Sequence, residues 1–171
     1  MRKALLISLT VIPIALAGAF AVYAHRAPQA STQSVTPTAT TVQQATPEEL
    51  LRLVNIERSK IGVAALTLDP AINATAQRKA DQVYTDKTVG HIDKNGVHGY
   101  MYMKEAGIKC SYGGENIVTN DSMMGKMSAD DAVLSWINSK AHHDAMIDPK
   151  YNTTGFGVRG WVVVEHFCVT E

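Results

Sequence analysis

Histidine is the residue type that offers the most chemistry in this chain of 171 residues. The six histidines are His25, His91, His98, His142, His143 and His166. Glu115 follows two glycines and precedes Asn116 in a predicted tight turn. Neutral imidazole and carboxylate oxygen are ligands for zinc and similar divalent ions, and the same groups transfer protons in acid–base catalysis. The residue types therefore point to a His/Glu cleft.

The spacing of these residues does not by itself establish a metal site. No H-E-x-x-H motif is present, and on a helix the adjacent His142 and His143 would point about 100° apart. His166 lies in an apolar segment beside Phe167, where a structural role is the simpler interpretation. Polar residues satisfied by hydrogen bonds in a groove therefore remain an alternative to a metal site.

The residues give less support to a serine hydrolase or to catalysis by cysteine. The chain has no G-x-S-x-G elbow, and Ser111 and Ser139 near the histidines have no supporting motif. Cys110 and Cys168 are the two cysteines. In an oxidising compartment they would form a disulfide, with two free buried thiols as the alternative. Their spacing suits no zinc knuckle.

The N-terminal residues have the organisation of an export signal. Arg2 and Lys3 precede an uncharged run over residues 4–24, which ends in the small-residue pattern Val22-Tyr23-Ala24. We interpret residues 1–24 as a signal peptide, with an uncleaved membrane anchor as the alternative. Residues 25–46, rich in Thr, Gln and Pro, are predicted to be a disordered linker. The predicted location is secreted, periplasmic or extracellular, with residues 4–24 as the tether if they are uncleaved.

Residues 47–171 are predicted to form one domain with a core of its own. The chain has 16 basic and 16 acidic residues, but three basic ones and no acidic one precede this domain. An excess of three acidic residues, with no basic stripe, argues against nucleic acid as a partner.

Capping and periodicity predict the elements that must position the histidines. Thr46, Pro47 and Glu49 begin a first helix that Gly62 stops, and a second helix begins at Pro70. Two further helices are expected at residues 97–106 and 129–138. Strands are expected at residues 113–118, 155–158 and 161–167, the last two joined by a turn at residues 159–160. Helices first and strands last favour an α+β fold.

The order of the motifs resembles the CAP superfamily of cysteine-rich secretory, antigen 5 and pathogenesis-related proteins, in its short bacterial type. The resemblance covers nearly all of residues 48–171. The matching segments are Asn55-Ile56-Glu57-Arg58, Gly90-His91, Gly107, Gly114-Glu115-Asn116-Ile117, Trp136 with Ser139-Lys140-Ala141-His142, and Tyr151 with Gly155-Phe156-Gly157-Val158. Each segment alone is a weak indicator of this family, whereas the order that the segments share is specific to it.

This resemblance implies a three-layer α-β-α sandwich around a central antiparallel sheet. It also implies a cleft in which His91, Glu115 and His142 occupy three of four family positions for a divalent cation. The fourth, an acidic residue in many members, is Ser139 here, and His143 stands where bacterial relatives usually have Arg. Asn116 is expected to support the turn.

Family members differ in activity, so the fold alone does not predict which reaction, if any, this protein catalyses. The leading hypothesis is a non-catalytic extracellular binding domain, whose cleft would hold a divalent cation, zinc rather than magnesium or calcium. Its partner would be an extracellular protein, a cell-wall component or a lipid. The alternatives are a metal-assisted hydrolase acting on peptide or cell-wall material, and a lipid carrier.

Overall fold

The computed structural model describes residues 41–170. Its elements are, in chain order, α1 (Pro47–Lys60), β1 (Thr67–Leu68), α2 (Pro70–Asp86), α3 (Met101–Glu105), β2 (Gly113–Thr119), α4 (Ala129–Ile137), α5 (Lys140–Met146), β3 (Thr153–Arg159) and β4 (Val162–Cys168). The predicted export signal lies outside the described residues. At the end of the predicted linker, Gln44 and Ala45 already contact the domain through hydrogen bonds to the carbonyl oxygens of Met127 and Gly160.

The helices begin where capping side chains can accept the first free backbone N–H groups. The Thr46 hydroxyl accepts from the Glu49 N–H at 3.2 Å, and Pro47 opens α1. The carboxylate of Asp69 accepts from the Ala71 N–H at 2.7 Å at the start of α2. Ser128 caps α4 in the same way. These three helix starts agree with the sequence-based expectations.

The four strands form one sheet in the order β1-β3-β4-β2. β3 pairs antiparallel with β4, and β4 pairs antiparallel with β2, whereas the two-residue β1 runs parallel to β3. Arg159 is paired with Val162, so the hairpin turn occupies Gly160 and Trp161, one residue later than predicted. Gly160 has a φ of +54°, a conformation that glycine adopts without strain.

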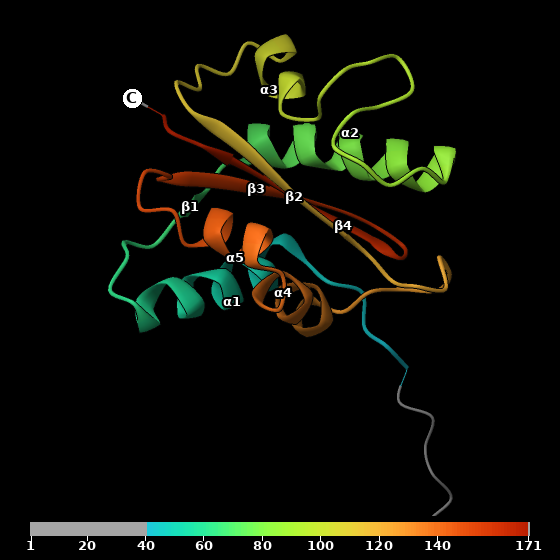
Figure 1. The fold of residues 1–171 in the computed structure, drawn as a ribbon, viewed down its shortest axis with the longest axis horizontal. Coiled ribbons are helices and arrows are strands. Elements are labelled where there is room, and N and C mark those ends of the chain that lie inside the picture. Colours follow the sequence, from blue (N-terminus) through green and yellow to red (C-terminus); the bar gives the residue numbers. More distant parts are fainter. Residues whose placement is uncertain (1–40, 171) are drawn as a thin grey trace, which may run out of the picture. The chain divides into compact units, whose positions relative to one another are not determined.

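Helices cover both faces of this sheet (Figure 1), which confirms the three-layer α-β-α architecture. α2 and α3 lie on one face, and α1, α4 and α5 lie on the other. Trp136, Phe156 and Phe167 belong to the core beneath α1 and α4. Trp161 and Val164 pack with the alanines of α2 on the opposite face. Each layer thus buries one apolar face against the sheet.

Two glycines of β3 allow α2 to approach the sheet closely. A Cβ atom at Gly157 would lie 2.2 Å from the backbone carbon and oxygen of Ala76. At Gly155 it would lie 2.3 Å from the backbone of Ile72 and Asn73. The Gly-x-Gly of the family motif therefore serves the packing of α2 on the sheet rather than a tight turn.

Arg58 ties α1 to the chain segment that leads from α5 into β3. Its guanidinium donates to the backbone oxygens of Ala64 at 2.7 Å, Met146 at 2.9 Å, Asp148 at 3.0 Å and Tyr151 at 3.1 Å. The side chain is fully buried. Arg58, the last residue of the matching segment Asn55-Ile56-Glu57-Arg58, therefore has a structural role.

Two helical predictions were incomplete. The third helix was expected over residues 97–106 but covers only Met101–Glu105. Its first part is instead used by a turn, because the Asp93 carboxylate accepts the Val97 N–H at 2.9 Å and Ile92 forms a β-bridge with His98. The short helix α5, which carries His142, was not predicted, since it buries only Met146.

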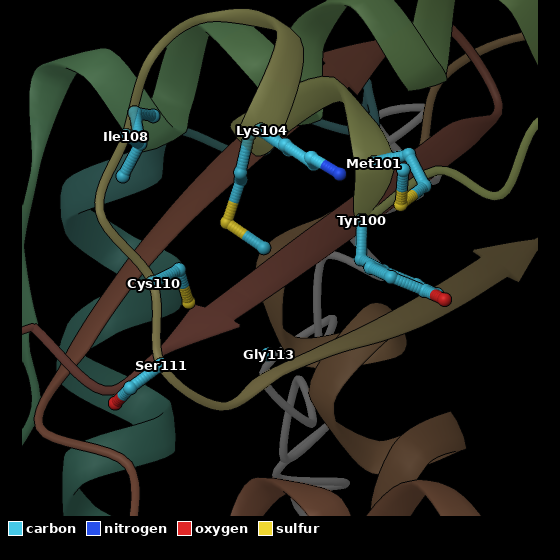
Figure 2. Close-up of a pocket in the computed structure, with 8 residues that line it drawn as sticks. Tyr100, Met101, Lys104, Ile108, Cys110, Ser111 and Gly113 are labelled. Carbon is cyan, nitrogen blue, oxygen red and sulfur yellow. The ribbon is translucent and has the colours of Figure 1, made fainter.

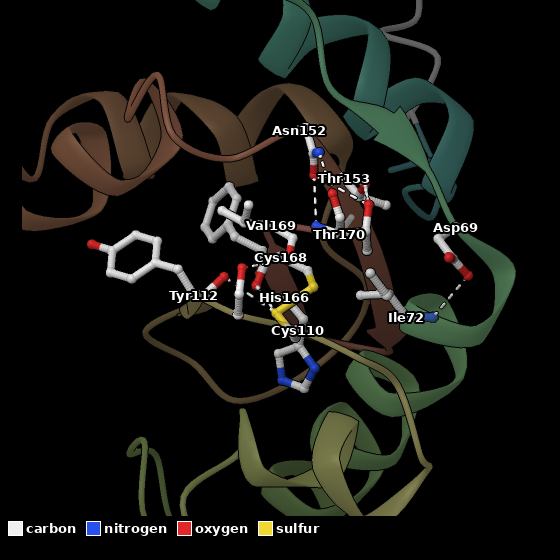
Figure 3. Close-up of a disulfide and its surroundings, with 12 residues drawn as sticks. Asp69, Ile72, Cys110, Tyr112, Asn152, Thr153, His166, Cys168, Val169 and Thr170 are labelled. Carbon is white, nitrogen blue, oxygen red and sulfur yellow. Dashed lines mark hydrogen bonds between the residues drawn. A yellow bond between two sulfur atoms is a disulfide. The ribbon is translucent and has the colours of Figure 1, made fainter.

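Cys110 and Cys168 form a disulfide, with Cα atoms 5.4 Å apart (Figure 3). It joins the segment before β2 to the end of β4. Backbone bonds accompany it, because the Ser111 N–H donates to the Val169 oxygen at 3.1 Å and the Val169 N–H donates to the Tyr112 oxygen at 2.9 Å. The predicted pairing is confirmed, and it fixes the segment that precedes Glu115.

Candidate functional site

Glu115 is held by two imidazoles, one at each carboxylate oxygen. Its side chain is 3% exposed on strand β2. Oε1 lies 2.8 Å from Nδ1 of His91, and Oε2 lies 2.9 Å from Nε2 of His166. The β2–β4 register places Glu115 directly opposite His166, so both side chains share one face of the sheet.

His166 connects this carboxylate to helix α2. It is fully buried, and its Nδ1 lies 3.0 Å from the Thr75 hydroxyl, which donates to the Ile72 oxygen at 2.8 Å. A continuous hydrogen-bonded chain therefore runs from α2 through His166 and Glu115 to His91. The structural role expected for His166 is correct, but its membership in the site was missed, because strand register is not readable from its apolar neighbours.

The loop that carries His91 lies over the carboxylate. The Gly99 N–H donates to the His91 oxygen at 2.9 Å, which closes this loop. A Cβ atom at Gly99 would overlap the Glu115 carboxylate, with Oε2 at 1.6 Å. Position 99 therefore requires glycine for the His91 loop to cover Glu115.

The charges at this site reinforce one another. Burial would raise the pKa of Glu115, but hydrogen bonds from His166 and His91 outweigh it and lower that pKa. The hydrogen bond to Glu115 raises the pKa of His91. Lys79, also fully buried, has a pKa lowered by burial, an effect that the Glu115 charge opposes. At neutral pH, Glu115 is therefore an anion anchored among cationic or donating groups.

His142 approaches from the opposite layer. The Asn116 side-chain amide donates to the His142 backbone oxygen at 3.0 Å and thus positions α5 against β2. Burial lowers the pKa of His142, and the nearby charge of His91 lowers it further. Asn116 therefore has a positioning role, because it holds the backbone of α5 against the edge strand β2.

Ser139 and His143 were also predicted to line the cleft, but neither is among the residues that line it. Ser139 is the N-cap residue of α5, without a side-chain capping bond. Nε2 of His143 lies 3.1 Å from Oε1 of Glu57 on α1. His143 is therefore directed to α1, and His98 takes a place in the cleft that the prediction had not assigned to it.

The cleft itself is a shallow hollow of about 320 Å³ lined by His91, His98, Tyr100 and Glu115. Within residues 41–170, no three or more His, Cys, Asp or Glu side chains are arranged to hold a metal ion. Because Nδ1 of His91 faces Glu115, the second nitrogen of this ring is the one that could bind a metal. A carboxylate that orients a metal-binding histidine in this way is a common supporting contact. Glu115 thus stands behind His91, whereas His142 is not among the residues that line this hollow.

Residues 51–160 match the profile of the CAP family, described as the cysteine-rich secretory protein family, and the chain belongs to that family. Two relatives come from Bacillus subtilis. YkwD is 26% identical over 110 residues, 64% of this chain and 41% of YkwD. The membrane protein YlbC is 26% identical over 117 residues, 68% of this chain and 32% of YlbC. The chain thus spans less than half the length of either relative.

Solved structures show the same fold. An extracellular SCP-domain protein of Bacillus anthracis has a TM-score of 0.67 and 18% identity over 72% of this chain and 40% of that chain. An outer surface protein of Borrelia burgdorferi has a TM-score of 0.64 and 16% identity over 72% of this chain and 92% of that chain. These similarities support the fold, and both proteins are extracellular or surface proteins. Among the helices of residues 41–170, none is long and apolar enough to cross a membrane.

Proposed function

We propose that this chain is an exported CAP-domain protein that binds an extracellular ligand at the His/Glu cleft without catalysing a reaction. The observation that carries the proposal is the double hydrogen bond to Glu115. A general base needs an accessible oxygen and a pKa near the working pH. Glu115 is buried, uses both oxygens, and has a lowered pKa. It is suited to anchor His91 rather than to accept a substrate proton.

Export is part of the proposal. The charged start and apolar run of residues 1–24 support it, as do the disulfide between Cys110 and Cys168 and the extracellular relatives. Expression of the full chain followed by N-terminal sequencing of the exported protein tests both export and cleavage. A new N-terminus near His25 indicates a released domain, an intact N-terminus in the membrane fraction indicates a tether, and retention in the cytoplasm contradicts the proposal.

A divalent cation is the ligand component that we propose for this cleft. His91 and His142 would hold it, because imidazole favours zinc over magnesium or calcium, which prefer oxygen ligands. When bound, the ion would supply a positive centre for anionic or carbonyl groups of a partner. Glu115 would keep the His91 ring in its binding orientation, and Asn116 would keep α5 in place through the His142 oxygen.

A metal titration followed by thermal unfolding tests this site, since an ion that binds only the folded state must raise the melting temperature. At 100 times its dissociation constant, zinc should add about 2.7 kcal/mol of stability. We expect His91→Ala combined with His142→Ala to abolish the shift. His143→Ala is the matched control, because that imidazole contacts Glu57. An unchanged melting temperature at saturating zinc, or equal losses in both variants, would refute the cation site.

The hydrolase alternative requires its own test. Purified protein, with and without zinc, should leave peptide and peptidoglycan libraries unchanged when the products are followed by mass spectrometry. Turnover that disappears in a folded Glu115→Gln variant would overturn the non-catalytic proposal. Intact far-UV circular dichroism of that variant is the necessary control, because Glu115 also supports the fold through His166.

A further inference from the structure

A second hollow, here called the disulfide pocket, lies between α3 and the segment that leads into β2 (Figure 2). Its volume is about 260 Å³, enough for a single amino-acid side chain or a ring of similar size. It is lined by Tyr100, Met101, Met103, Lys104, Ile108, Cys110, Ser111 and Gly113. Figure 2 shows Lys104 and Tyr100 on the α3 side of the hollow, opposite Cys110 and Ser111.

The walls of the disulfide pocket combine sulfur-containing and aliphatic side chains with the polar groups of Tyr100, Lys104 and Ser111. Met101, Met103 and Ile108 supply aliphatic surface, and Cys110 contributes its half of the disulfide. Thioether sulfur is polarizable and makes favourable contacts with aromatic rings, and methionine side chains adapt to the shape of what they contact. These walls are therefore suited to a small apolar or aromatic group.

Glycine at position 113 keeps the floor of the pocket open. A Cβ atom there would lie 3.2 Å from Cε of Met103 and 3.4 Å from Sγ of Cys110. A side chain at this position would crowd Met103 and Cys110, so that Met103 would have to shift. The disulfide holds the opposite wall, because it ties Cys110 to the buried Cys168 at the end of β4.

The pocket carries one charged residue, and that residue has no partner in the part of the chain that the structure describes. Lys104 forms no ion pair there, because the adjacent Glu105 binds Arg78, with Oε2 2.6 Å from Nη1. Lys109 is also exposed, and it lies between Ile108 and Cys110, which line the opposite wall of the pocket. Lys104 thus brings a positive charge to the pocket beside the aliphatic and sulfur-containing part of its wall.

We propose that the disulfide pocket binds a small apolar or aromatic group that carries a carboxylate. The apolar group enters among Met101, Met103 and Ile108, and the carboxylate pairs with Lys104 at the mouth. A free organic acid and the apolar C-terminal residue of a peptide both have this chemistry. Tyr100 lines both this pocket and the His/Glu cleft, so the two sites adjoin, but the proposal does not depend on a cation at the cleft.

The test uses N-acetylphenylalanine as the probe, titrated into isotope-labelled protein and followed by amide NMR shifts. We expect saturable shifts at Ile108 and Gly113 with a dissociation constant of about a millimolar, typical for a ligand of this size. N-acetylphenylalaninamide, which lacks the carboxylate, should bind about threefold more weakly, the range of an exposed ion pair. Hexanoate compared with an acetylated Gly-Gly-Phe peptide then distinguishes a free acid from a peptide C-terminus.

Charge reversal separates Lys104 from general electrostatic attraction. Lys104→Glu should remove the preference for the acid over the amide, whereas Lys109→Glu, with the same change of net charge, should preserve it. Both lysines are exposed, so both variants are expected to fold. The proposal is wrong if the probe causes no shifts at 20 times the expected dissociation constant, about 20 mM. It is also wrong if the shifts map only to the His91 loop, or if both variants behave alike.

Discussion

Replacing Arg58 by alanine should be among the most destabilising single changes in this domain. The guanidinium donates to four backbone oxygens, in two buried and two partly buried hydrogen bonds, and its removal leaves these acceptors without that partner. An orphaned buried acceptor costs about 1 kcal/mol at the low end, so the total is about 4 kcal/mol. Domains of this size are stable by about 5–15 kcal/mol. The substitution should therefore remove a large part of the free energy of unfolding.

Urea denaturation followed by tryptophan fluorescence measures this loss directly. Arg58→Lys keeps the charge that faces Glu165, but one ammonium cannot reach all four oxygens, so we expect roughly half the loss. Arg52→Ala on the exposed face of α1 is the matched control and should change stability by about 0.5 kcal/mol or less. If Arg58→Ala costs no more than Arg52→Ala, the bonds to the segment between α5 and β3 contribute little and the reasoning fails.

Further changes test other parts of the fold. Reduction of the disulfide between Cys110 and Cys168, which are 58 residues apart, should cost about 4 kcal/mol and lower the melting temperature in calorimetry; equal melting with and without reductant would contradict this. Gly157→Ala should destabilise by about 3 kcal/mol in urea, because α2 leaves no room for a Cβ atom, and a neutral effect would contradict the close approach. Burial raises the pKa of Glu165 well above its usual value. The folded protein therefore keeps a proton on Glu165 that the unfolded chain loses above pH 4.5, and the contribution of this group to wild-type stability falls as pH rises from there. Glu165→Gln should gain stability relative to wild type between pH 4 and pH 7, and a constant difference in unfolding free energy would contradict the raised pKa.

Much of the fold follows from local sequence signals. The helices α1, α2 and α4 begin at side chains that cap their own backbone, so a few adjacent residues suffice to predict them. The hairpin of β3 and β4 follows from two apolar runs and a glycine turn, although its turn lies one residue later than expected. Helix α5 has no capping bond and one buried residue, so no local pattern marks it.

The site shows the same division between local and long-range information. His91, Glu115 and His142 could be chosen from motif order, because each stands in a recognisable short segment. His166 and Thr75 could not, because their roles depend on the register between β2 and β4 and on the close packing of α2. These contacts join residues up to 91 positions apart, and no local propensity encodes such a pairing.

The linear chain thus carries the family, the layer order, the helix starts and the candidate histidines, because capping, periodicity and motif order are properties of neighbouring residues. Packing of the chain was needed to show that His143 turns to Glu57 and that Glu115 has imidazoles at both oxygens. The physical reason is that hydrogen-bond partners depend on where strands and helices meet in space. The disulfide pocket likewise became visible only in the folded chain, because its lining comes both from the region of α3 and from residues 108–113.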